Sequence, residues 1–190
     1  MSAQLPMSGS ITVEQYLSYE APEGIRDELI DGEIILSPSP KPRHATLIMR
    51  LSNLLQQALE DSDFEVRLDT SIRLKDSRSM PRPDILVMDQ TRWDAAEEAD
   101  VYPPVPQLAI EIFSPANSKK AFARKIEIYL KNGALAVWVL HPDSKTIVVH
   151  TSEGRLEVRE SNSVSFPPSL PSVLIPVAKV FAPRRASKKS

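Results

Sequence analysis

The chain has 190 residues, a formal net charge of −2 and no cysteine. The lack of cysteine excludes disulfides, cysteine-ligated zinc fingers and thiol catalysis. No apolar run approaches the length that spans a membrane, and residues 1–10 lack the basic and apolar regions of a signal peptide. We therefore expect a cytoplasmic protein that does not interact with a membrane.

The positive charge is unevenly distributed. Four positive charges lie in the segment 183–190, so the rest of the chain carries a net charge of −6. A strong non-specific interaction with a polyanion needs a basic surface, which this charge disfavours, although a nuclease active site is itself acidic. We expect residues 1–10 and 183–190 to be disordered and residues 11–182 to form a single domain.

The first half of the chain contains clear turn and helix signals. Thr12 and Gln15 form a capping box that begins a short helix. A tight Asp31-Gly32 turn joins two strand-like segments into a hairpin over residues 26–36. After a proline-rich connector, leucines recur at helical spacing and predict a helix over residues 43–60.

The remaining segments predict a sheet. Alternating apolar residues indicate a long strand over residues 64–74, followed by a polar loop. The acidic, proline-containing segment 89–106 is expected to be an irregular surface crossover. Further strands are predicted at residues 83–88, 108–113, 134–140, 146–150 and 155–160, and helices at 119–131, capped by Asn117 or Ser118, and 177–181. This order predicts an α/β (α+β) fold with a mixed central β-sheet flanked by helices, preceded by an N-terminal helix and a β-hairpin.

Two of the apolar strands each contain one acidic residue. Asp84 shares its strand face with Leu86 and Met88, and Glu111 shares its face with Ala109. An ionised carboxylate on an apolar face is costly unless it is paired, hydrogen-bonded or bound to a metal. The alternative is that both acids lie at strand ends and point into solvent.

A lysine and a third acid extend this pattern. Lys125 lies on the predicted helix 119–131, four residues before Tyr129 and therefore on the same side. Asp84 and Glu111 could bind Mg²⁺ or Mn²⁺ and leave positions for a phosphate, while Lys125 orients water, helps to deprotonate it or stabilises charge. Glu28 could complete the cluster, or it could be a solvent-facing strand acid or a partner for Arg26.

The sequence lacks the motifs of other common kinds of active site. The chain contains no Gly-x-Ser-x-Gly motif and no phosphate-binding glycine loop, and its three histidines show no metal-ligand spacing. His44 opens the long helix beside Arg43, and we expect a surface or capping histidine rather than a base or a phosphate contact.

Several short motifs occur together along the chain: Glu28-Leu29-Ile30-Asp31-Gly32-Glu33-Ile34, Ser37-Pro38, Arg43-His44, Pro83-Asp84-Ile85, Glu111-Ile112-Phe113-Ser114-Pro115, and Lys125 followed by Tyr129, Gly133 and Trp138. In this order they resemble the Uma-two family of the restriction-endonuclease-like PD-(D/E)XK superfamily, over residues 12–182. The resemblance implies a Mg²⁺-dependent (or Mn²⁺-dependent) endonuclease that cleaves DNA, with pairing of two copies. By the family pattern, Asp84 and Glu111 are metal ligands, Lys125 is the catalytic lysine and Glu28 is the accessory acid.

The chain departs from that pattern at two places. The family has an acid one helical turn before the lysine, where this chain has Ala121, and Val-Asp-Pro where it has Leu140-His141-Pro142. Loss of the acid removes a potential partner that orients Lys125. The alternative function is therefore a nuclease fold with weak or no turnover that acts as a nucleic-acid- or protein-binding module.

Overall fold

The computed structural model describes residues 10–75, 77–114 and 119–183. The tails expected to be disordered, and the expected helix caps Asn117 and Ser118, lie almost entirely outside these residues. Within the part of the chain that the structure describes, no helix combines the length and apolar character needed to cross a membrane.

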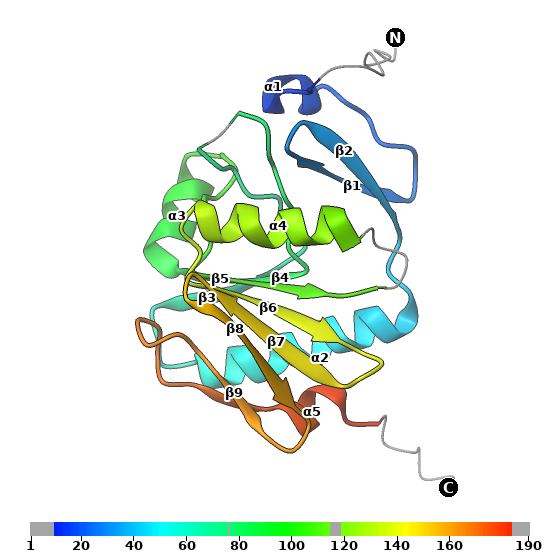
Figure 1. Cartoon of the computed structure of the whole chain (residues 1–190). Helices are drawn as coiled ribbons and strands as arrows, with labels where there is room; N and C mark the ends of the chain where they lie inside the picture. Colours follow the sequence, from blue (N-terminus) through cyan, green and yellow to red (C-terminus); the bar gives the residue numbers. More distant parts are fainter. Residues whose placement is uncertain (1–9, 76, 115–118, 184–190) are drawn as a thin grey trace, which may run out of the picture.

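The centre of the molecule is a six-stranded sheet with the order β3-β4-β5-β6-β7-β8 (Figure 1). Its strands are β3 (Phe64–Leu68), β4 (Ile85–Asp89), β5 (Leu108–Ile112), β6 (Ala136–His141), β7 (Thr146–Thr151) and β8 (Gly154–Arg159). The pair β5 and β6 is parallel and the other neighbours are antiparallel. The predicted mixed central sheet is confirmed.

Helices cover both faces of this sheet. Helices α2 (Pro42–Ala58) and α5 (Val177–Phe181) lie on one face, and α4 (Lys119–Lys131) lies on the other beside the N-terminal elements (Figure 1). Strand residues divide accordingly: Ile85 packs in the cluster with the leucines of α2, while Leu86 packs with residues of α4. Burial on both faces explains why the central strands are almost entirely apolar.

The N-terminal elements are α1 (Val13–Tyr16) and the hairpin of β1 (Ile25–Ile30) and β2 (Glu33–Pro38), both as predicted. The turn requires glycine at position 32, where φ is +81° and an added Cβ would lie 2.1 Å from Oγ of Ser10. Arg124 of α4 forms two ion pairs with residues of the turn. Its Nε lies 2.9 Å from Oδ2 of Asp31, and its Nη1 lies 2.9 Å from Oε2 of Glu33. The hairpin is therefore fixed to the helix that carries Lys125.

The predicted strand over residues 64–74 is wrong in its second half. Strand β3 ends at Leu68 because Asp69 has φ of +49°, in the left-handed region, which breaks the strand. The residues beyond still bury apolar side chains, since Ile72 and Leu74 lie in the core, but Leu68 is 43% exposed.

The irregular crossover predicted for residues 89–106 is wrong in its first half, whereas residues 99–106 contain no helix or strand, as predicted. The first half contains α3 (Gln90–Glu98), whose N-cap Asp89 accepts a hydrogen bond from the backbone N–H of Arg92 at 3.2 Å. Only Ala96 of this helix is buried, so it lacks the apolar stripe that reveals a helix in a sequence. A small second sheet of β9 (Ser163–Ser165) and β10 (Leu174–Pro176) was not predicted either.

Candidate active site

Asp84 and Glu111 meet at the same end of two neighbouring strands. The antiparallel register pairs Ile85 of β4 with Ile110 of β5, which places Asp84 opposite Glu111. Opposite residues project from the same face of a sheet, here the α4 face. Asp84 is 5% exposed and Glu111 is 4% exposed, so neither acid points into solvent, although Asp84 lies at a strand end.

The carboxylate of Asp84 is held from three sides. Oδ2 accepts the backbone N–H of Ile112 at 2.8 Å, and Oδ1 contacts Nε2 of His44 at 3.1 Å and Nη1 of Arg26 at 3.3 Å. Burial tends to raise the pKa of Asp84, but the contact with His44, the positive charge of Lys125 and the Ile112 N–H outweigh burial and lower it. Asp84 is therefore ionised at neutral pH.

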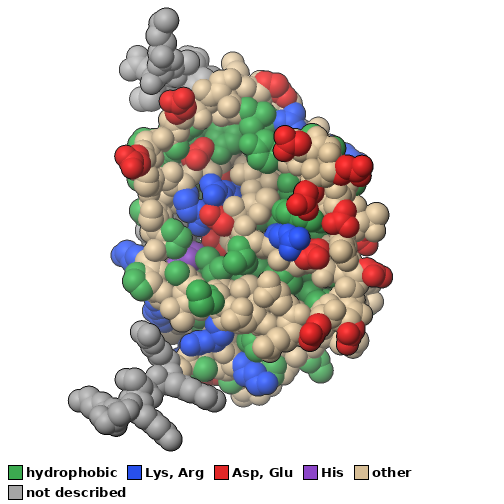
Figure 2. Space-filling model, turned by 180° about the vertical axis from the view of Figure 1, so that it is seen from behind, with side chains coloured by type: hydrophobic (Ala, Val, Ile, Leu, Met, Phe, Trp, Pro, Cys, Tyr) green, Lys and Arg blue, Asp and Glu red, His purple; other side chains and the backbone are tan. Residues whose placement is uncertain are grey.

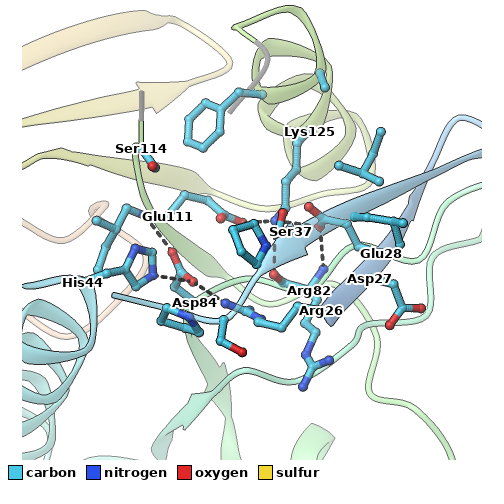
Figure 3. A pocket seen from close by; sticks show the side chains of 18 of the residues that line it. Arg26, Asp27, Glu28, Ser37, His44, Arg82, Asp84, Glu111, Ser114 and Lys125 are labelled. Carbon is cyan, nitrogen blue, oxygen red and sulfur yellow. Dashed lines mark hydrogen bonds and ion pairs between the residues drawn. The ribbon is translucent and has the colours of Figure 1, made fainter. Parts of the chain in front are cut away.

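Lys125 binds Glu111 and Glu28 together. Its Nζ lies 2.9 Å from Oε1 of Glu111 and 2.7 Å from Oε2 of Glu28, and it donates to the backbone oxygen of Arg82 at 3.1 Å (Figure 3). The hydroxyl of Tyr129, one helical turn further on, donates to Oε1 of Glu111 at 2.7 Å. The side chain of Lys125 is thus oriented by three groups, even though position 121 is not acidic.

The charges in this cluster shift its pKa values in a consistent way. Burial raises the pKa of Glu111 to about 8, against the opposing effect of Lys125, and the negative charges of Asp84 and Glu28 add to the rise. Burial alone would lower the pKa of Lys125, but the carboxylates of Glu111 and Glu28 outweigh it and raise the pKa. At neutral pH the lysine is therefore a cation, and a divalent cation bound beside Glu111 would lower the raised pKa of that carboxyl group.

These side chains border a cavity of about 380 Å³. The hairpin, the start of α2, the strand ends and α4 contribute the lining residues Arg26, Glu28, His44, Arg82, Asp84, Glu111 and Lys125, with the proline-rich connector and Ser114 at its wall (Figure 3). On the face of the molecule in Figure 2, basic and acidic side chains lie together in a hollow, whereas acidic side chains crowd one edge.

The structure brings together all four residues selected from the sequence. Glu28 faces Lys125, with its side chain 15% exposed, and is neither a solvent-facing acid nor the partner of Arg26. The expectation for His44 is wrong: Lys41 is the N-cap of α2, and His44 is half-buried against Asp84. Sequence reasoning also missed Arg26 as a contact of Asp84, because only the tertiary arrangement of the hairpin brings the two residues together.

The donor set suits a hard divalent cation. Asp84 and Glu111 offer carboxylate oxygens on one cavity wall, and Mg²⁺ is commonly held by one or two carboxylates together with waters and substrate phosphate. Among the described residues, no group of three His, Asp or Glu side chains is placed to hold a metal ion. The residues therefore fit an ion that is completed by water and substrate rather than one enclosed by protein.

The fold is similar to that of a known protein. A crystal structure described as "a putative nuclease belonging to DUF820" from Anabaena variabilis superposes with a TM-score of 0.80, covering 90% of this chain and 97% of that one at 22% sequence identity. At this identity the similarity shows the fold, which is nuclease-like. A Synechocystis sp. protein named "Uncharacterized protein slr1290" is 25% identical over 131 residues, 68% of this chain and 67% of that protein.

The sequence places the chain in a particular family within this class. The family model Uma2, described as "Putative restriction endonuclease", matches residues 13–178. That match covers the sheet, the hairpin and α4. The chain belongs to the Uma2 family.

Proposed function

We propose that this protein is a metal-dependent endonuclease that hydrolyses phosphodiester bonds in DNA. The observation that carries the proposal is the convergence of Asp84, Glu111 and Lys125 on one cavity, with Nζ of Lys125 2.9 Å from Oε1 of Glu111. Two acids on adjacent strands and a cationic lysine are the groups that metal-assisted phosphodiester hydrolysis requires. Membership of the Uma2 family, described as "Putative restriction endonuclease", supports the same reaction.

In this proposal Asp84 and Glu111 hold Mg²⁺ or Mn²⁺. The ion, when bound, would act as a Lewis acid that polarises the scissile phosphate. Asp84 is ionised and oriented by Ile112 and His44, so it is prepared to bind a cation. Glu111 would lose its proton when the cation binds, because the new positive charge favours the carboxylate.

Lys125 would stabilise the negative charge that develops on the phosphate. Its pKa is raised by Glu111 and Glu28 against the effect of burial, so it acts as an ammonium ion rather than as a base. Glu28 would act as the accessory acid, which keeps the ammonium group positioned from the hairpin side at 2.7 Å. The proposal includes a cytoplasmic location and pairing of two copies so that each site cuts one strand.

The metal requirement is tested by incubating the purified protein with supercoiled plasmid. We expect conversion to nicked or linear DNA with Mg²⁺ or Mn²⁺ and none in excess chelator. Light scattering of the same preparation reports whether two copies pair. Plasmid that stays supercoiled with every divalent ion would overturn the proposal and favour a nuclease fold that only binds.

A further inference from the structure

We propose that Arg26 and Arg82, both held by Asp69, form a subsite that binds a phosphodiester group of the DNA strand beside the catalytic carboxylates. This inference rests on the proposed function in taking DNA as the substrate. Arg26 also contacts Asp84, and the backbone of Arg82 contacts Lys125 and Glu28, but the side chains of Arg82 and Asp69 have no role in the site described above.

The two guanidinium groups are anchored to one carboxylate. Nη2 of Arg26 pairs with Oδ1 of Asp69, and Nη2 of Arg82 pairs with Oδ2 at 2.8 Å. Arg82 also donates from Nε to the backbone oxygen of Asp69 at 3.1 Å. Asp69 is itself fixed, because its backbone N–H donates to the backbone oxygen of Asp84 at 3.2 Å. The arginine pair is therefore attached to the strand end that carries the metal ligand.

Arg26 is held only weakly on the side of Asp84. Two guanidinium groups share Asp69, and the contact of Arg26 with Asp84 is 3.3 Å, longer than the roughly 2.7–2.9 Å of a strong charge-assisted hydrogen bond. Asp84 is also contacted by Nε2 of His44 and by the backbone N–H of Ile112, so its position does not depend on Arg26 alone.

The pair is also accessible. Arg26 and Arg82 line the cavity, with side chains 21% and 29% exposed (Figure 3). Each guanidinium has five N–H donors, of which the contacts above use two. The remaining donors allow the two-pronged binding of phosphate oxygens that arginine favours. Because the body of the chain is acidic, a local basic subsite is needed to hold a DNA strand against it.

The test is a binding measurement that does not depend on cleavage. A fluorescein-labelled duplex of 20 base pairs is titrated with the full chain in excess chelator, and anisotropy is followed at several salt concentrations. The variant is Arg82→Gln, and the matched control is Arg159→Gln, which removes the same charge from β8, where the side chain is 77% exposed. Unfolding midpoints of all proteins are recorded in the same buffer.

We expect Arg82→Gln to weaken binding at least about fivefold more than the control and to lower the slope of log K against log salt by about 0.9. Arg82→Lys keeps the positive charge without the planar guanidinium group, so it should lose less DNA affinity than Arg82→Gln. If Arg82→Gln does not fold, Arg82→Lys is measured in its place. A purely structural pair would lower the unfolding midpoint of the Arg82 variants and leave DNA affinity equal to that of the control, which would overturn the subsite.

The remaining outcomes separate this proposal from the nuclease itself. Affinity that depends on Arg82 in a protein that never cleaves would support the subsite and contradict the nuclease. Cleavage with unchanged DNA affinity and KM in Arg82→Gln would overturn the subsite alone. Absence of duplex binding by the wild type would also overturn the subsite. So would a protein that binds inorganic phosphate through Arg82 but does not bind the duplex.

Discussion

Nζ of Lys125 lies 2.9 Å from Oε1 of Glu111, and both side chains are buried. The first residue belongs to α4 and the second to β5, so this contact joins the helix layer to the sheet at the centre of the candidate site. Above the raised pKa of Glu111 this contact is a buried ion pair, which contributes little net stability when it is intact and becomes costly when one partner is removed. Substitution of either residue should therefore produce a measurable change in the free energy of unfolding.

The first prediction concerns the pH dependence of stability in Glu111→Gln. Burial raises the pKa of Glu111 from its ordinary value of 4.5 to about 8, so between these pH values folding requires a proton that the unfolded chain does not hold. The stability contributed by neutral Glu111 is complete below pH 4.5 and is lost as pH rises to about 8. Glutamine stays neutral and avoids this loss.

The variant should therefore be more stable than the wild type at pH 9, by at least about 1 kcal/mol or roughly 2–4 °C in Tm. The difference should shrink towards pH 5. Thermal unfolding of metal-free protein across this range measures it. A difference that is constant with pH, or that grows on acidification, would contradict the raised pKa.

The second prediction is a coupling between Lys125 and Glu111. Lys125→Met removes the cation shared by Glu28 and Glu111, and at about pH 9, where Glu111 is ionised, it should destabilise the protein by about 3–5 kcal/mol. Adding Glu111→Gln removes one of the two carboxylates and should restore part of this loss. Urea unfolding of the two single variants and the double variant gives the coupling energy, and additive effects would show that the two groups do not interact.

The third prediction compares two neighbours at the start of α2. His44→Ala removes a contact of Oδ1 of buried Asp84 and should cost about 1 kcal/mol at pH 7. Arg43→Ala breaks an ion pair with Asp143 and a hydrogen bond to the backbone oxygen of Pro142. Both contacts are on the surface, with the side chains of Arg43 and Asp143 64% and 75% exposed, so the effect on stability should be small. Denaturant midpoints measured in parallel decide the matter. Equal effects would mean that His44 does not support Asp84.

The fourth prediction concerns metal binding without DNA. Millimolar Mg²⁺ or Mn²⁺ should raise the Tm of the wild type, because an ion that binds only the folded state stabilises it. Asp84→Asn and Glu111→Gln should abolish the rise, whereas Arg43→Ala should keep it. If the ion raised the Tm of Asp84→Asn as much as that of the wild type, it would bind at a different site.

Much of the fold follows from local patterns in the sequence. The leucine stripe of α2, the Asp31-Gly32 turn and the capping box at Thr12 depend on neighbouring residues, and the structure confirms all three elements. Helix α3 was missed because it lies on the surface with only Ala96 buried, so tertiary position rather than periodicity maintains it. The end of β3 depends on the left-handed backbone of Asp69, which no composition pattern reveals.

Part of the candidate site could likewise be predicted from the sequence, and part of it depends on tertiary packing. A single acid in each of two apolar strands is visible in the sequence, because burial of a charge is an anomaly. The contacts of His44 and Arg26 with Asp84 join residues 40 and 58 positions apart and follow only from the packing of α2 and the hairpin against β4. The partners of Lys125 also depend on that packing, since Glu28 reaches it from β1.

The central claim is that Asp84 and Lys125 perform DNA hydrolysis. Its most direct test is cleavage of supercoiled plasmid in Mg²⁺ or Mn²⁺ by wild type, Asp84→Asn, Lys125→Met and the surface control Arg43→Ala, purified identically. We expect nicking or linearisation by the wild type and the control, and at least about a hundredfold less by the other two variants. Equal cleavage by all four proteins would reveal a contaminating nuclease and contradict the assignment of this site.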